Sequence, residues 1–182
     1  MPCPRRHGGT LSWHSPPSCL RSAPLAAGES EPVPAASFSL RPYTPEDFEA
    51  LYEIDQLCYP PAIAYSRREM KMYLRAPGAA CVIAEADAKP IGFCLTAHEE
   101  AWGYIITIDV LDPHRRQGAG TMLLRDAEQR LAVQGVKEVA LETATDNPPV
   151  IAFWKKHNYR IYAVQKGYYP GGLDAYSMRK PL

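Results

Sequence analysis

A short glycine-rich turn is the clearest candidate for chemistry in this sequence. A strand-like run ends at Val110, and Arg115-Arg116-Gln117-Gly118-Ala119-Gly120-Thr121 leads from it into a helix-like run. Glycine has no Cβ, so backbone N–H groups in such a turn can approach a ligand closely. The first turn of a helix also leaves several N–H groups unpaired at the positive end of the helix dipole. The turn therefore predicts an anion site that suits a phosphate or a pyrophosphate.

The turn taken alone leaves a second interpretation open. A tight connection from strand to helix, with two exposed arginines, explains the same residues without any ligand, and short motifs give many false matches. No Gly-Lys-Ser or Gly-Lys-Thr follows, so the turn is not a Walker A loop, and it also differs from the six-residue dinucleotide glycine pattern. Residues elsewhere in the chain must decide between the two interpretations.

The elements around the turn predict a mixed α/β domain. Alternating apolar residues indicate strands, and apolar residues three and four apart indicate helices. Strands are predicted near 37–41, 81–85, 91–96, 104–110, 136–143, 160–166 and 175–180, and helices near 44–59, 66–74, 120–134 and 147–158. This order, β-α-α-β-β-β-α-β-α-β-β, predicts a central mixed sheet of about seven strands flanked by about four helices.

Specific residues mark several of the predicted boundaries. Thr44-Pro45 and Ser66-Arg67-Arg68-Glu69 are typical helix starts, and the second of them is a capping box. Gly135 and Asn158 suit the left-handed conformation that ends many helices. The stretch Asp87-Ala88-Lys89-Pro90 indicates a hairpin turn between two strands.

The first 36 residues differ from the rest of the chain. They contain seven prolines and no apolar period, so they cannot bury enough surface to offset the entropy of ordering. We expect residues 1–36 to form a disordered, proline-rich leader and residues 37–182 to form the folded domain. A targeting peptide and an over-long predicted start are both compatible with the leader.

Composition excludes some classes of function. The charges of twenty basic and twenty acidic residues cancel, so the formal net charge is zero. A neutral chain is not expected to bind nucleic acid nonspecifically or to have a membrane partner. No apolar run approaches the roughly 20 residues of a membrane helix. The five cysteines contain no CxxC pair, so we expect free thiols in a reducing cytoplasm and no metal site.

The wider context of the turn resembles a known family. Arg115-x-x-Gly118-x-Gly120 resembles the acyl-CoA signature of the GNAT superfamily of N-acetyltransferases, and Glu142 and the segment 147–159 follow it in that family's order and spacing. The resemblance covers about residues 37–182. It is greatest to the bacterial ribosomal-protein alanine N-acetyltransferases and related protein N-terminal acetyltransferases. The residues that carry this finer likeness are Asn147-Pro-Pro-Val-Ile-Ala-Phe-Trp, Gly167-Tyr168-Tyr169-Pro170 and the ending Ala175-Tyr-Ser-Met-Arg-Lys-Pro-Leu.

The resemblance implies acetyl-CoA as the co-substrate and assigns contacts to it. Backbone groups from 108 to 110 would pair with the pantetheine arm and the acetyl group, and the glycine turn would hold the pyrophosphate. The Asn147 side chain would contact the pantetheine end, and Trp154 would pack against the arm. The expected coenzyme-binding residues are Ile108, Asp109, Val110, Arg115, Arg116, Gln117, Gly118, Ala119, Gly120, Thr121, Asn147 and Trp154.

The resemblance also implies catalytic residues. Glu142 matches the family's general base, which would take a proton from the attacking amine directly or through water. Trp154 stands where the family often has a tyrosine that protonates the departing thiolate, and an indole N–H is not a usable acid. Tyr168, Tyr159 or water could supply that proton, or the thiolate could leave unprotonated.

Four tyrosines are expected on the acceptor side. Tyr168 and Tyr169 would line it from the late Gly-Tyr-Tyr-Pro stretch, and Tyr59 and Tyr65 from the loop that contains Pro60 and Pro61. Aromatic side chains that simply cover a sheet edge are the alternative.

The attacking amine must be neutral, which favours one class of acceptor. An α-amine, with a reference pKa of about 7.7–8.0, loses its proton far more readily than a lysine at about 10.4.

The sequence thus predicts an enzyme that moves an acetyl group from acetyl-CoA to a primary amine by direct attack. The amine is expected to be a protein N-terminus of the ribosomal-protein alanine type. A small-amine or lysine acetyltransferase, and a coenzyme-A-binding protein without turnover, stay open. A monomer and a homodimer are both compatible with the sequence.

Overall fold

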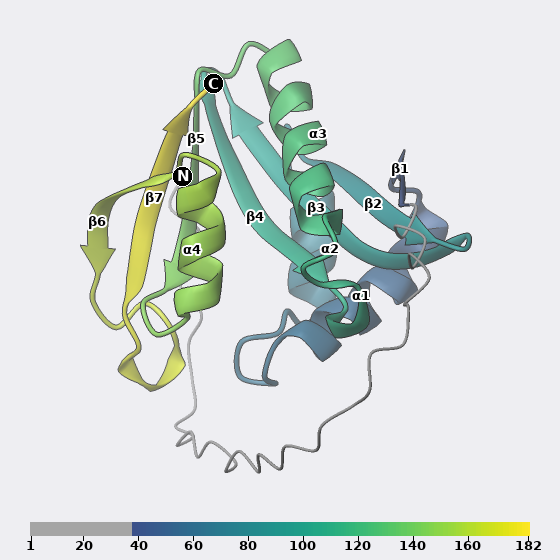
Figure 1. The fold of residues 1–182 in the computed structure, drawn as a ribbon, viewed down its shortest axis with the longest axis horizontal. Coiled ribbons are helices and arrows are strands. Elements are labelled where there is room, and N and C mark those ends of the chain that lie inside the picture. The colour runs from purple at the N-terminus through teal and green to yellow at the C-terminus, as the bar shows by residue number, and fades with distance from the viewer. Residues whose placement is uncertain (1–37) are drawn as a thin grey trace, which may run out of the picture.

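The structure is a computed structural model that describes residues 38–182. The predicted leader, 1–36, lies outside the described residues. The strands are β1 (Ser39–Pro42), β2 (Ala80–Ala86), β3 (Lys89–Glu99), β4 (Trp102–Val110), β5 (Glu138–Ala144), β6 (Arg160–Gln165) and β7 (Ala175–Pro181). The helices are α1 (Phe48–Cys58), α2 (Arg67–Leu74), α3 (Ala119–Val133) and α4 (Pro148–Lys156), as Figure 1 shows. The predicted order of strands and helices is confirmed.

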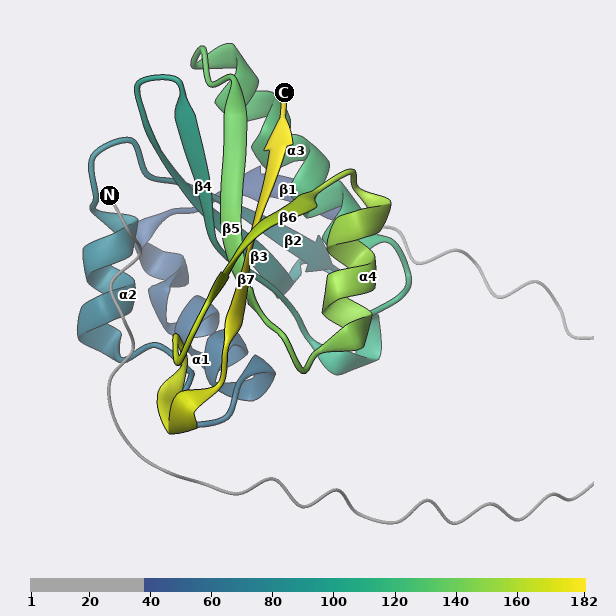
Figure 2. The same cartoon turned by 90° about the vertical axis from the view of Figure 1, so that its left-hand side faces the viewer.

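A single sheet of seven strands forms the centre of the fold. Its strand order is β1-β2-β3-β4-β5-β7-β6. Among the strand pairs of residues 38–182 only β4–β5 is parallel, so the predicted mixed sheet is confirmed. Helices α3 and α4 lie on one face of the sheet, and α1 and α2 lie on the other (Figures 1 and 2). Two hydrophobic cores result, a larger one under α3 and α4 and a smaller one under α1 and α2.

The parallel pair β4–β5 is short, and this opens the sheet. The two strands pair only at Trp102↔Glu138, Gly103↔Val139 and Tyr104↔Ala140. A Cβ at Gly103 would lie 3.0 Å from Val136, so close packing fixes the paired end. Beyond it the strands diverge, as Figure 1 shows. The backbone edges that face this opening have no neighbouring strand there.

The local boundary signals are mostly confirmed. The Ser66–Glu69 capping box is present, and Gly135 and Asn158 adopt positive φ after α3 and α4. The hairpin prediction differs in one respect. Only Asp87 and Ala88 form the turn, with φ of 49° and 59°, while Lys89 and Pro90 already belong to β3. The register with β2 shifts between Ala84 and Glu85, where Ile91 is the extra residue of β3 next to Pro90, and such bulges are among the places where proline occurs in a sheet.

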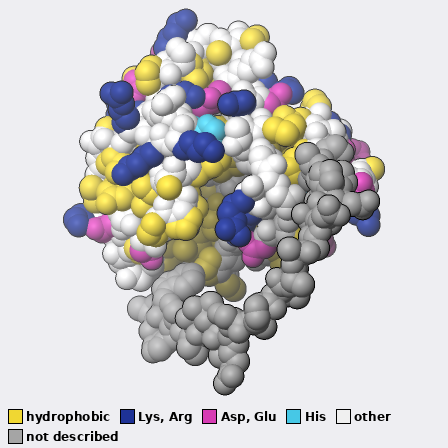
Figure 3. All heavy atoms as spheres, in the orientation of Figure 1, with side chains coloured by type: hydrophobic (Ala, Val, Ile, Leu, Met, Phe, Trp, Pro, Cys, Tyr) yellow, Lys and Arg dark blue, Asp and Glu magenta, His cyan; other side chains and the backbone are white. Residues whose placement is uncertain are grey.

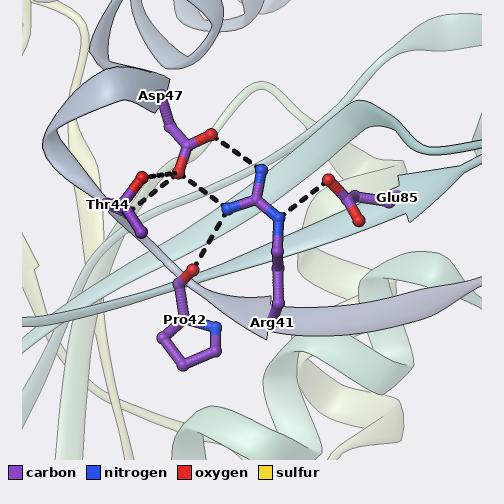
Figure 4. A network of polar contacts seen from close by, with 5 residues as sticks. All are labelled: Arg41, Pro42, Thr44, Asp47 and Glu85. Atoms are coloured by element: carbon purple, nitrogen blue, oxygen red, sulfur yellow. Dashed lines mark hydrogen bonds and ion pairs between the residues drawn. The ribbon is translucent and has the colours of Figure 1, made fainter.

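Arg41 joins the first strand to the helix start and to β2. Its guanidinium bonds both carboxylate oxygens of Asp47 at 2.7 Å and Glu85 Oε1 at 2.8 Å, and Figure 4 shows the arrangement. The Thr44 N–H donates to the same Asp47 carboxylate at 2.8 Å. Hydrogen bonds from Arg41 lower the pKa of Asp47 to about 2.

Asp47→Asn is expected to lower the free energy of unfolding at pH 7 by roughly 1–2 kcal/mol, because it breaks a charged hydrogen-bonded pair whose arginine is partly exposed. A depressed carboxyl pKa stabilises the fold above the unfolded value of 3.8. That contribution is lost as the pH falls towards 2. Urea unfolding at pH 7 and pH 3 checks this: the difference from the wild type should shrink at pH 3. Glu49→Gln, in an exposed pair with Arg67, is the control and should change little.

Candidate active site

The glycine turn forms the start of α3. Gly118 is its N-cap with φ of 101°, and the preceding Arg116 also has a positive φ of 60°. Because the N-cap is a glycine, no side chain covers the end of the helix, and a Cβ at Gly118 would meet no atom within 4 Å. The N–H groups of Ala119, Gly120 and Thr121 belong to this first turn and lie at the positive end of the helix dipole.

The side chains of Arg115 and Gln117 form hydrogen bonds with backbone carbonyls that precede the turn. Arg115 Nε donates to the Val110 carbonyl at 2.7 Å, and its guanidinium forms an ion pair with Asp112. Gln117 Nε2 donates to the Pro113 carbonyl at 2.6 Å. Arg116 is exposed and forms no side-chain hydrogen bond or ion pair with the described part of the chain. Of the two arginines, Arg116 is therefore the better placed to pair with an anion.

The edge of β4 that faces the opening carries unpaired backbone groups. The Leu111 N–H bonds to the Ile91 carbonyl, and residues along an antiparallel strand alternate in the direction of these groups. Given the register with β3, the backbone of Asp109 faces β3, whereas Ile108 and Val110 face the opening. Two of the three predicted backbone contacts are thus directed towards it, and Asp109 is not. Cys58 Sγ and Arg115 already bond the Val110 carbonyl.

Two buried polar residues on β4, Thr107 and Asp109, help to hold the loop that follows α1. Thr107 Oγ1 donates to Asp109 Oδ1 at 2.8 Å, and Tyr59 Oη lies 3.2 Å from Thr107 Oγ1. Burial, and then the charge of Asp109, raise the pKa of Tyr59, so its hydroxyl stays protonated. Tyr65 is 5% exposed and donates to the Ile106 carbonyl at 3.3 Å. Tyr59 and Tyr65, both predicted to bind the acceptor, therefore attach this loop to β4, and the ring of Tyr65 lies in the smaller core.

Glu142 lies two residues beyond the last β4–β5 pair. Its neighbour Leu141 belongs to the core under α3 and α4, so Glu142 points to the opposite face of the sheet. Ser177 Oγ and Gln165 Nε2 donate to Glu142 Oε1 at 3.3 and 3.2 Å. Burial raises the pKa of Glu142, and the hydrogen bond from Ser177 partly opposes this. A half-buried carboxylate with a raised pKa is a stronger base than an exposed one.

Helix α4 contacts the cradle through residues that the sequence did not single out. The ring of Phe153 lies 3.7 Å from where a Cβ would stand at Gly120, and His157 Nε2 lies 3.2 Å from Thr121 Oγ1. Trp154 is 4% exposed and packs edge-on against Phe153 and Tyr159 in the larger core. The structure thus gives Trp154 little surface for a coenzyme. No local signal in the sequence marks contacts between residues so far apart along the chain.

The predicted start of α4 is confirmed, and its N-cap is Asn147, a residue also predicted to bind the coenzyme. Asn147 is the N-cap, and its Oδ1 accepts a hydrogen bond from the Val150 N–H at 3.4 Å. Two prolines occupy the first helical positions. The Asn147 side chain is exposed, and its amide N–H groups are directed away from this bond. A ligand contact by Asn147 stays a prediction.

The loop between β6 and β7 carries the two tyrosines of the Gly-Tyr-Tyr-Pro stretch. Tyr168 is 8% exposed and stands edge-on to Tyr169, with ring centroids 4.9 Å apart. Asp174 fixes the loop: its Oδ1 accepts from the Gly167 N–H at 2.9 Å, and its carbonyl accepts from the Thr145 N–H at 3.1 Å. The loop is therefore bonded to the chain just after β5, the strand that carries Glu142.

Tyr159, a second candidate proton source, lies elsewhere. Its side chain is 1% exposed, and its hydroxyl donates to Glu128 Oε1 on α3 at 2.9 Å. Burial raises its pKa well above the usual range. Tyr159 thus connects the end of α4 to α3 within the core, and the role of Tyr168 on the acceptor side stays a prediction.

The surface at this site combines hydrophobic and basic side chains. Figure 3 looks onto the face that carries α3 and α4, where a recessed hydrophobic area has Lys and Arg side chains around it. An apolar recess with a basic rim suits a ligand with an apolar arm and phosphate groups. Within residues 38–182, no group of three or more His, Cys, Asp and Glu could hold a metal ion. None of the helices in that range is long and apolar enough to span a membrane.

Comparison with known proteins gives relatives for this arrangement. A model of the acetyltransferase (GNAT) family matches residues 48–159. An N-alpha-acetyltransferase of Saccharolobus solfataricus is 29% identical over 158 residues, covering 80% of this chain and 93% of that protein. The ribosomal-protein-S18-alanine N-acetyltransferase of Escherichia coli has a similar structure, with a TM-score of 0.73, 23% identity, and 80% and 94% of the two chains covered. The complex of Arabidopsis thaliana NAA60 with acetyl-CoA gives a TM-score of 0.70, 20% identity, and 80% and 99% covered.

The matched range includes every residue predicted to bind the coenzyme and the predicted base. The diverging strands β4 and β5, the cradle at α3, and Glu142 all lie within it. The structural likenesses, at 23% and 20% identity, establish the shared fold. Because the family model spans more than half of the chain, the chain belongs to the acetyltransferase (GNAT) family.

Proposed function

We propose that this protein transfers the acetyl group of acetyl-CoA to the free α-amine of a polypeptide. The observation that carries the proposal is Glu142, a half-buried carboxylate with a raised pKa at the opening between β4 and β5. Its side chain points away from the face that carries α3 and α4, so an acceptor would approach from the opposite side to the coenzyme. The relative named N-alpha-acetyltransferase, similar over 80% of this chain, supports an α-amine as the acceptor.

The residues present fit a bound acetyl-CoA. The first turn of α3 would hold its pyrophosphate through backbone N–H groups, with Arg116 beside them. The edge of β4 offers Ile108 and Val110 to the amides of its pantetheine arm, and Phe153 supplies an apolar wall at Gly120. When bound, acetyl-CoA supplies an activated acetyl thioester.

The chain's own residues then direct the proton and the charge. Glu142 would take a proton from the acceptor's ammonium group, directly or through one water, which frees the lone pair for attack. Backbone N–H groups at Ile108 and Val110 are directed to the opening and could stabilise negative charge on the thioester oxygen. Burial raises the pKa of the Cys58 thiol to about 11. This thiol stays protonated at neutral pH and is a poor nucleophile, which supports direct attack by the amine.

Tyr168→Phe tests the proton donor for the departing thiolate. If Tyr168 donates this proton, the substitution should lower kcat roughly tenfold or more and leave the Kd for acetyl-CoA unchanged. Stopped-flow measurement of coenzyme release at saturating acceptor gives the rate. Tyr162→Phe, on the exposed part of β6, is the control and should retain full activity. An unchanged kcat for Tyr168→Phe would show that the thiolate leaves unprotonated or takes its proton from water.

The acceptor class is tested by thiol release from acetyl-CoA against three sets of amines. Peptides with free α-amino termini that begin with alanine, serine, methionine or lysine form the first set. The same peptides with blocked termini and an internal lysine form the second, and polyamines form the third. Release with free termini alone supports the proposal, and release with either other set alone overturns it. Coenzyme binding without any release would indicate a binding protein.

We further propose a cytoplasmic location, because the described cysteines are free thiols.

A further inference from the structure

Two side chains on neighbouring strands hold the carboxylate of Glu142. Ser177 on β7 lies directly opposite Glu142 on β5, and Gln165 reaches the same place from β6. Both donate to Glu142 Oε1, Ser177 at 3.3 Å and Gln165 at 3.2 Å. Gln165 Nε2 also donates to Ser177 Oγ at 2.7 Å. The three side chains form a closed triangle of hydrogen bonds across three strands.

We propose that Ser177 and Gln165 are positioning residues for acetyl transfer, which fix Oε1 of Glu142 and leave Oε2 directed at the acceptor amine. The inference rests on the proposed role of Glu142 as the base. Neither residue stands out in the sequence, because the contacts span 35 and 23 positions along the chain.

The directions of these hydrogen bonds follow from the chemistry of the groups. A carboxylate oxygen can only accept, so the nitrogen of the Gln165 amide, and not its oxygen, must face Glu142. Ser177 Oγ accepts from Gln165, so its single proton is free to point at Glu142. Ser177 is 1% exposed, and water therefore cannot readily replace it. Two donors on one oxygen restrict a glutamate that otherwise has three rotatable bonds, which is the purpose of a preorganised site.

The charged groups nearby are paired with one another. On the same face of the sheet, Arg179 on β7 pairs with Glu138 on β5 at 3.4 Å, and its guanidinium lies 3.6 Å from the centre of the Tyr162 ring on β6. On β4, Asp109 accepts a hydrogen bond from Thr107. None of these charges contributes to the raised pKa of Glu142, which results from burial and is opposed by the Ser177 hydrogen bond. Removing the Ser177 hydroxyl should therefore leave burial less opposed and raise that pKa further. Removing the Gln165 amide takes away a second donor to the same carboxylate oxygen and the bond that orients Ser177, so the same direction is expected.

The experiment compares kcat/KM from pH 6 to pH 9 for the wild type, Ser177→Ala and Gln165→Met. Methionine nearly matches glutamine in size but cannot donate. Each variant is expressed as a ratio to the wild type at the same pH, so that the titration of the acceptor amine cancels. A base that holds its proton more tightly is less often ionised at low pH. We expect the acid limb of the kcat/KM profile to move to higher pH in both variants, so that both ratios are lower at pH 6 than at pH 9.

Two controls separate the possible outcomes. Thr96→Val removes another buried strand hydroxyl, which bonds the Ala80 carbonyl on β2, and its ratio should not depend on pH. Ratios for Ser177→Ala and Gln165→Met that are lowered equally at every pH would mean a merely structural role and would overturn the inference. If Ser177→Ala does not fold, the half-buried Gln165 still provides the test. Glu142→Gln is measured alongside: full activity there would reject the base itself, whereas its loss together with flat ratios would reject only the positioning pair.

Discussion

Replacing Glu142 with glutamine is expected to lower kcat/KM for a peptide acceptor by about 10²–10⁴, the usual contribution of a general base. Glutamine keeps the size of the side chain, and its amide oxygen can still accept from Ser177 and Gln165, so the site should keep its shape. Because the cradle at α3 and the edge of β4 do not include Glu142, the Kd for acetyl-CoA should stay within about twofold of the wild type. Steady-state kinetics and calorimetric titration with acetyl-CoA check the two halves of this expectation.

The same substitution is expected to stabilise the fold at neutral pH. Burial raises the pKa of Glu142 above 4.5, so this carboxyl favours the folded state below that value, where it is protonated. The benefit is lost as the pH rises through the folded pKa, because a charge is then held in a half-buried place. Glutamine carries no charge, so Glu142→Gln should melt above the wild type at pH 7 and show little difference at pH 4. A Tm below that of the wild type at pH 7 would contradict this stability prediction. Parallel losses of activity and of affinity for acetyl-CoA would contradict the role of Glu142 as the base.

Much of the fold follows from local signals, and these act within a few residues. The capping box at Ser66, the left-handed residues Gly135 and Asn158, and the Asn147 cap each fix a boundary through contacts with their own neighbours. The cradle at Gly118 is of the same kind, because a strand end, a glycine and a helix start are adjacent along the chain. Such features are readable from sequence because their physical causes are local.

The parts of the site that the sequence did not reveal depend on contacts between distant strands. The ring of Trp154 packs against Tyr159 in the larger core, and Phe153, which the sequence does not single out, stands at the cradle. A contact of Trp154 with the coenzyme stays a prediction. Ser177 became part of the site only through the register of β5 with β7. A shift of one residue in that register would turn Ser177 to the other face of the sheet, so no local pattern could have identified it.

Replacing Gly118 with alanine is expected to weaken acetyl-CoA binding about tenfold, or roughly 1.4 kcal/mol. Gly118 has φ of 101° and an empty space around its missing Cβ, which is the space that a pyrophosphate at the helix end would occupy. An alanine at positive φ also costs about 1–2 kcal/mol, so it favours a shift of the turn that would misdirect the N–H groups of Ala119 and Gly120. Calorimetric titration with acetyl-CoA measures the affinity.

Gly135→Ala is a closely matched control for this prediction. Gly135 has φ of 87°, a Cβ there would also meet nothing within 4 Å, and the residue lies beyond the other end of α3. Both variants should therefore lose a similar free energy of unfolding, about 1–2 kcal/mol, and only Gly118→Ala should lose affinity for acetyl-CoA. Equal affinities for the two variants would mean that the turn is an ordinary connection from strand to helix, the interpretation that its residues alone left open. Weaker binding by Gly118→Ala alone would locate the pyrophosphate at the start of α3. Both variants carry the same kind of backbone strain, and they differ in which end of α3 the glycine occupies.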